Sequence, residues 1–177
     1  MKRVALGMAV LTTAAGLTIT APAATTTTAT TTAVTNGNYG ANAQISINRD
    51  VRFKGGTPVG GWTSLTLFSD GTYRWSGHIR DSGAPSYNFS GVCTVRFSSG
   101  GTFAFKTSGR LHGTFESGSR NHDWNKSGRI PEIVQAWRTS PTYKWNCNNS
   151  VKLNLSAVLD AALQVVGATA TVISIVA

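Results

Sequence analysis

The sequence predicts an all-β fold, an antiparallel meander forming a β-sandwich or small barrel, with one short helix and a C-terminal amphipathic helix or hydrophobic tail. From Trp62 onward, apolar residues alternate with polar ones, which is the period of a strand with one buried face. Short segments rich in Gly, Ser, Asp and Pro interrupt this alternation, as turns do. Residues 39–153, which carry the pattern, are enough for one domain and too few for two.

The N-terminal segment has the features of an export signal. Lys2 and Arg3 precede an apolar run, and residues 21–23 (Ala-Pro-Ala) resemble a small-residue cleavage site. We therefore expect residues 1–23 to be a secretory signal peptide and the mature protein to be extracellular. A membrane anchor is the alternative, although four threonines dilute the apolar run. The Thr-rich residues 24–38 contain too little apolar surface to offset chain entropy, so we expect a disordered leader.

The strands are predicted from the alternation, and the turns from their Gly, Asp and Pro residues. The Asp-Gly pair at Asp70 and Gly71 is typical of a tight hairpin. In the strand that follows, Tyr73, Trp75 and Ile79 share the buried face. Further strands are expected over residues 87–97, 102–106, 110–116 and 143–147.

One pattern occurs twice in the chain. Residues 69–83, SDGTYRWSGHIRDSG, and residues 98–118, SSGGTFAFKTSGRLHGTFESG, both contain a turn, Gly-Thr-aromatic-x-aromatic and then Ser-Gly. Two hairpin units that each place two aromatic side chains in a core need the same Gly-containing turn and a Ser-Gly kink. We therefore interpret the repeat as mainly architectural.

The remaining segments are less regular. Residues 118–128 consist of turn formers and polar residues around Trp124, which predicts an ordered loop. Pro131 suits the first turn of a helix that places Ile133 and Trp137 on one face. Residues 154–177 form a hydrophobic C-terminal segment, with helical spacing followed by a β-branched tail. We expect this segment to dock on the β-domain, and membrane contact by the stretch that begins at Leu155 and ends at Ala177 is the alternative.

The two cysteines, Cys93 and Cys147, both fall on buried strand faces. In an exported chain this predicts a disulfide, whereas two buried free thiols are the alternative.

The chain is basic, with a formal net charge of +9, or +7 without Lys2 and Arg3. Such an excess favours encounters with polyanions, although it also serves solubility alone. Strand parity places seven cationic or potentially cationic side chains on one outward face of three or four neighbouring strands, with no acidic residue among them before Glu116. These residues are Arg74, His78, Arg80, Arg96, Lys106, Arg110 and His112. An outward aromatic beside them, such as Trp124, would favour a polysaccharide or single-stranded nucleic acid.

A second candidate site is the loop cluster of Glu116, His122, Asp123 and Trp124. Paired carboxylates for glycoside hydrolysis would come from Asp81, Glu116 and Asp123, but the acid-Ser-Gly context of the first two favours turn stabilisation. The sequence lacks the spacing of a zinc site and the motifs of serine hydrolases or phosphate-binding loops. We therefore assign no catalytic residue, metal or cofactor.

Two phrases, FSDGTYRWSGHIRDSGAPSYNF and GTFESGSRNHDWN, resemble an uncharacterised family of small secreted domains found chiefly in actinomycetes. The resemblance rests on turn and aromatic signatures and implies secretion and an all-β domain. It transfers no catalytic residue, and the C-terminal hydrophobic segment lies outside it.

Together these features favour a secreted, non-catalytic, monomeric binding module. Its basic sheet face would recognise an extracellular polyanion, a cell-wall polymer or an anionic membrane surface. One alternative is a membrane-active or antagonistic protein that uses the C-terminal segment. Another is a hydrolase that uses Glu116 with His122 or Asp123, which requires a cleft uniting them.

Overall fold

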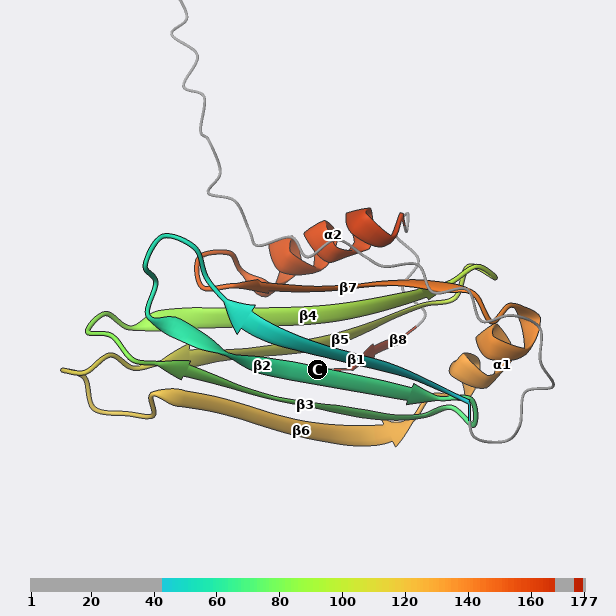
Figure 1. Cartoon of the computed structure of the whole chain (residues 1–177), viewed down its shortest axis with the longest axis horizontal. Coiled ribbons are helices and arrows are strands. Elements are labelled where there is room, and N and C mark those ends of the chain that lie inside the picture. The colour runs from blue at the N-terminus through green and yellow to red at the C-terminus, as the bar shows by residue number, and fades with distance from the viewer. Residues whose placement is uncertain (1–42, 168–173, 177) are drawn as a thin grey trace, which may run out of the picture.

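The computed structural model describes residues 43–167 and 174–176 and confirms the all-β sandwich (Figure 1). Its strands form two four-stranded sheets. Sheet 1 has the order β1-β2-β3-β6, and sheet 2 has the order β7-β4-β5-β8. All neighbouring strands are antiparallel except the pair β5 and β8, which is parallel. The elements are β1 (Gln44–Arg52), β2 (Val59–Phe68), β3 (Thr72–Asp81), β4 (Tyr87–Phe97), β5 (Thr102–Leu111), β6 (Asn121–Arg129), α1 (Pro131–Thr139), β7 (Tyr143–Ser150), α2 (Leu155–Val166) and β8 (Ser174–Val176).

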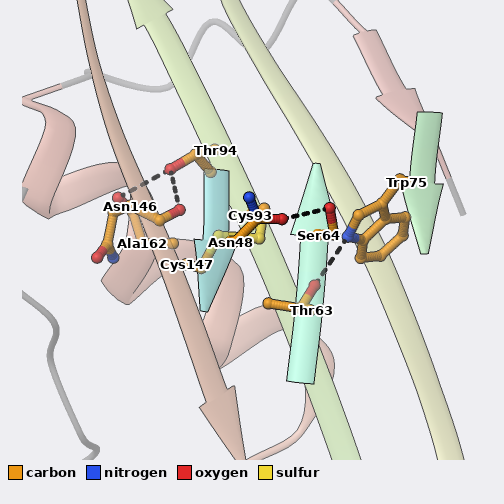
Figure 2. The surroundings of a disulfide bond; sticks show 9 residues. All are labelled: Asn48, Thr63, Ser64, Trp75, Cys93, Thr94, Asn146, Cys147 and Ala162. Atoms are coloured by element: carbon orange, nitrogen blue, oxygen red, sulfur yellow. Dashed lines mark hydrogen bonds between the residues drawn. A yellow bond between two sulfur atoms is a disulfide. The ribbon is translucent and has the colours of Figure 1, made fainter. Parts of the chain in front are cut away.

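The core lies between the inner faces of the two sheets. Leu65 and Trp75 of sheet 1 are buried there, as are Phe89 and Phe105 of sheet 2. The predicted disulfide is present: Cys93 of β4 and Cys147 of β7 lie directly opposite each other, and both are buried (Figure 2). Because the bond joins two neighbouring strands of sheet 2, it fixes their register.

The repeated Ser-Gly pairs do not kink the strands. Gly77 lies within β3 and Gly109 within β5, and both strands continue through them. A Cβ on Gly77 would lie 2.0 Å from the Trp124 ring, and one on Gly109 would lie 2.4 Å from Nδ1 of His122. The two glycines therefore make room for two inward side chains of β6, so the repeat is architectural in a way that the strand pattern did not predict.

The prediction of a loop over residues 118–128 is wrong for most of its length, because residues 121–129 form β6. This strand pairs with β3 from Thr72 to Arg80 and forms an edge of sheet 1. Its inward side chains include His122 and Lys126, which lie partly buried beside Trp124. Because an edge strand beside solvent tolerates polar residues on both faces, its sequence lacks the apolar alternation of the other strands.

The prediction of a strand over residues 110–116 is wrong after Leu111, where β5 ends and a turn follows. The backbone N–H of Gly113 donates to Ser86 Oγ at 2.9 Å, and that of Thr114 donates to the Gly83 carbonyl at 3.0 Å. These bonds tie the turn to the loop between β3 and β4. Phe115, which a continued strand would place on the same face as the buried Leu111, is 88% exposed.

Both predicted helices are confirmed. Helix α1 begins at Pro131 and buries Ile133 and Trp137. Helix α2 is capped by the Asn154 side chain and ends before Gly167, which has a left-handed φ of 69°.

Helix α2 packs against β4, β7 and β5, so its predicted docking on the β-domain is confirmed (Figure 1). The predicted signal peptide and leader, and residues 168–173 and 177 of the tail, lie outside the described residues. Within the described ranges, no helix is both long and apolar enough to cross a bilayer.

Candidate functional site

The seven basic residues predicted to share one face are divided between the two sheets. Arg74, His78 and Arg80 lie on β3 in sheet 1. The other four lie on or directly after strands of sheet 2: Arg96, Lys106, Arg110 and His112. The prediction of neighbouring strands fails because the chain crosses between sheets after β3, so outward residues of β3 and β4 face opposite sides of the sandwich. The structure therefore contains two candidate faces.

We call the outward side of sheet 1 the open face. The pairing of its strands places outward residues in rows across β1, β2, β3 and β6. Among these outward strand residues are four arginines and two aspartates, a positive balance although not the purely cationic face predicted. The charged members are Arg52, Arg74, Arg80, Arg129, Asp50 and Asp123.

Trp62 lies near the middle of the open face. It is 45% exposed, with Asp50 opposite on β1 and His78 opposite on β3. A shallow depression of about 520 Å³ adjoins Trp62, Asp50 and Asn48. Trp124, by contrast, is buried. The outward parity of Trp62 relative to Leu65 and Leu67 is visible in the sequence and is the signal that could have identified it.

Polar side chains around Trp62 hold one another in place. His78 Nδ1 lies 2.6 Å from Asp123 Oδ1, and Ser64 Oγ donates to Asn48 Oδ1 at 2.6 Å. Figure 2 shows the second pair bridging β1 and β2. Because these contacts already fix the side chains, a ligand bound here would cost them less conformational entropy.

We call the outward side of sheet 2 the covered face, because α2 lies over it. Arg96 donates to the Val166 carbonyl at 3.4 Å, which places its positive charge at the C-terminal end of α2. Lys106 is half-buried beside the gap between β5 and β6. None of the sheet 2 cations therefore extends the open face.

Arg110 and His112 lie outside the area that α2 covers, and both contact the carboxylate of Glu116. Arg110 donates to Glu116 Oε2 at 3.1 Å, and His112 Nδ1 lies 3.4 Å from the same oxygen. Hydrogen bonds from Ser86 and Arg110 hold the pKa of Glu116 below its usual value. Glu116 is therefore an ionised partner that organises this turn.

The loop cluster predicted as a second site does not converge. His122 points between the sheets, where Nε2 lies 2.8 Å from Thr107 Oγ1. Asp123 is the next residue of the strand and points to the open face, while Glu116 binds Arg110 and His112. The hydrolase hypothesis requires a cleft shared by these groups, and their contacts direct them to three different places. The turn role predicted for Asp81 is seen directly, since its Oδ1 accepts from the Gly83 N–H at 2.7 Å.

His122 lies beside a hollow of about 320 Å³ between the edges of β5 and β6. Lys106 and Lys126 also line it. Burial lowers the pKa of His122, and nearby Lys126 adds to this effect, whereas Asp123 opposes it. Over the described ranges, no three His, Cys, Asp or Glu side chains form a group that could hold a metal ion.

In comparisons with known proteins, no family model matched the chain, and no curated protein or solved structure matched it significantly. The resemblance to a secreted actinobacterial family therefore stays a prediction.

Proposed function

We propose that this protein is a secreted, non-catalytic binding module whose open face recognises an acidic polysaccharide. The observation that carries the proposal is the exposed Trp62 in a row with Asp50, His78 and Asp123. An exposed indole on the outer face of a sheet provides an apolar surface on which the C–H face of a sugar ring can stack. The carboxylates and amides around it suit hydroxyl groups.

The arginines supply the preference for acidic polymers. Arg74 and Arg80 are exposed on the outward side of β3. Arg80 is the next outward residue after His78, and Arg74 is the second outward residue before it. Their guanidinium groups present paired donors to a carboxylate. Asp50 and Asp123 beside Trp62 oppose the charge of either polyanion, so they do not by themselves separate the two ligands. Single-stranded DNA is the weaker fit because only the polysaccharide offers hydroxyl donors to these carboxylates on every ring.

The first experiment compares Trp62→Ala with Phe115→Ala. Both substitutions remove an exposed aromatic ring, but Phe115 lies on the turn after β5, outside the open face. Affinity for polygalacturonate, measured by titration calorimetry at low salt, should fall about tenfold or more for Trp62→Ala, which corresponds to about 1.4 kcal/mol. It should change little for Phe115→Ala. Equal effects of the two variants would overturn the assignment of the open face.

The charge requirement is tested separately. The double variant Arg74→Glu/Arg80→Glu should bind polygalacturonate weakly and with a smaller dependence on salt, because electrostatic attraction is screened by ions. Arg138→Glu, an exposed substitution on α1, is the single-charge control. The neutral polymer dextran and oligothymidylate are the comparison ligands. Tighter binding to oligothymidylate than to polygalacturonate would contradict the polysaccharide proposal.

A further inference from the structure

The covered face is chemically polar although a helix lies on it. The outward residues of the three strands beneath and beside α2 are hydrophilic except for Val92 and Ala104. They are Asn88, Ser90, Val92, Thr94 and Arg96 of β4, Thr102, Ala104, Lys106, Ser108 and Arg110 of β5, and Lys144, Asn146, Asn148 and Ser150 of β7. Such a composition is typical of a sheet face in water rather than of a helix-packing surface.

Several of these polar groups are buried without full hydrogen bonding. Asn146 is 0% exposed and Asn148 is 2% exposed. Within the part of the chain that the structure describes, Oδ1 and Nδ2 of Asn146 and Oδ1 of Asn148 have no hydrogen-bond partner. A buried polar group left unpaired costs about 1 to 3 kcal/mol. The packing of α2 therefore includes a penalty that a permanent apolar interface would avoid.

The attachment of α2 is also separate from the main core. Val158 and Ala162 form a small buried cluster with Val92, whereas the large cluster between the sheets includes no residue of α2. Two hydrogen bonds add to this attachment, from Thr94 Oγ1 to the Ala162 carbonyl at 3.4 Å and from Arg96 to the Val166 carbonyl. In Figure 2, Thr94, Asn146 and Ala162 lie on the far side of the disulfide from Trp75. Removal of α2 would therefore leave the core between the sheets enclosed.

We propose that α2 is a displaceable cover and that the face beneath it is a second binding face, which opens when the helix leaves. The amides of Asn146 and Asn148 can both donate to and accept from hydroxyl groups. Arg96, released from Val166, and the neighbouring Lys144 would supply positive charge. The face thus suits a further segment of an acidic polysaccharide. This ligand class rests on the proposed function, whereas the displacement of α2 does not.

The test uses Val158→Asp in the full chain, with Gln164→Asp as the matched control. Val158 is fully buried against the sheet, whereas Gln164 lies on the exposed side of the same helix. Amide hydrogen exchange of residues 155–166 should rise at least tenfold in Val158→Asp and should stay unchanged in β2 and β3. Gln164→Asp should resemble the parent protein. Amide exchange that rises equally in α2, β2 and β3 would overturn the proposal that α2 is a displaceable cover.

Binding is then measured with Trp62→Ala present to weaken the open face. Adding Val158→Asp should increase affinity for polygalacturonate at least fivefold, and adding Asn148→Leu should remove that gain. Selective opening of α2 without any gain in affinity for polygalacturonate would overturn the proposal of a second binding face.

If Val158→Asp does not fold, native-state amide hydrogen exchange of the parent protein in low concentrations of urea tests the displacement of α2 instead. Amides of α2 should open with a lower free energy than those of β4, and equal opening free energies would overturn the proposal. This measurement needs no ligand. It therefore tests the displacement of α2 even if the open face does not bind polygalacturonate.

Discussion

The open face and the covered face have similar polar compositions and opposite surroundings. Around Trp62, polar side chains contact one another at the surface, as in the pair of His78 and Asp123. Beneath α2, Asn146 is buried, and no group among the described residues forms a hydrogen bond with its side-chain amide. A two-sheet sandwich needs only the inner face of each sheet to be apolar. Either outer face is therefore available for binding, and what distinguishes them here is a helix.

The two faces also differ in how much stability depends on them. Exposed polar contacts such as that of His78 with Asp123 contribute little to folding, because water competes for both groups. The open face can consequently be altered without a large effect on the fold. The covered face lies on strands that the disulfide joins, so changes near it should affect stability more.

Loss of the disulfide should have the largest effect. Cys93 and Cys147 are 54 residues apart, so the loop-entropy model predicts that Cys93→Ala/Cys147→Ala lowers the free energy of unfolding by about 4 kcal/mol. Urea unfolding followed by tryptophan fluorescence measures this. Under conditions where the variant stays folded, binding by the open face should persist, because sheet 1 contains no cysteine. A loss below about 1 kcal/mol, or an equal loss of open-face binding in the folded variant, would contradict this separation.

A pair of asparagines compares the two faces directly. Asn146→Leu removes the unpaired amide under α2 and should raise the free energy of unfolding by about 1 to 2 kcal/mol. Asn125→Leu makes the same change on the exposed outward side of β6 and should alter it by less than about 0.5 kcal/mol. Urea unfolding of both variants measures the difference. Destabilisation by Asn146→Leu would show that its amide is satisfied and that α2 packs without the proposed penalty.

The sequence predicted the features that depend on local pattern. Alternation identified the strands with apolar inner faces, and the inward parity of Cys93 and Cys147 identified the disulfide. Pro131 marked the start of one helix, and helical spacing after residue 154 marked the other. In each case, neighbouring residues in the chain contain the information.

The features that were not predicted depend on contacts between distant segments. Strand β6 is polar because it is an edge strand, and only its pairing with β3 reveals it. The division of the basic residues between two faces depends on the crossing after β3, which residue parity does not record. Likewise, Val92 and Thr94 have outward parity, but they are buried because α2 covers them.

The smallest expected effect concerns His122, which lies where the edges of the two sheets meet. Burial lowers its pKa in the folded protein relative to the ordinary value of 6.5. As pH falls below 6.5, the unfolded chain therefore binds a proton more readily than the folded chain, and stability decreases. His122→Gln should flatten the fall in thermal unfolding temperature between pH 8 and pH 5.5. Lys126→Gln removes a lesser cause of the same pKa shift and should flatten it less. An unchanged pH dependence in His122→Gln would mean that the junction between the sheets admits the charged imidazole, and that the hollow beside Lys106 is more hydrated than its burial indicates.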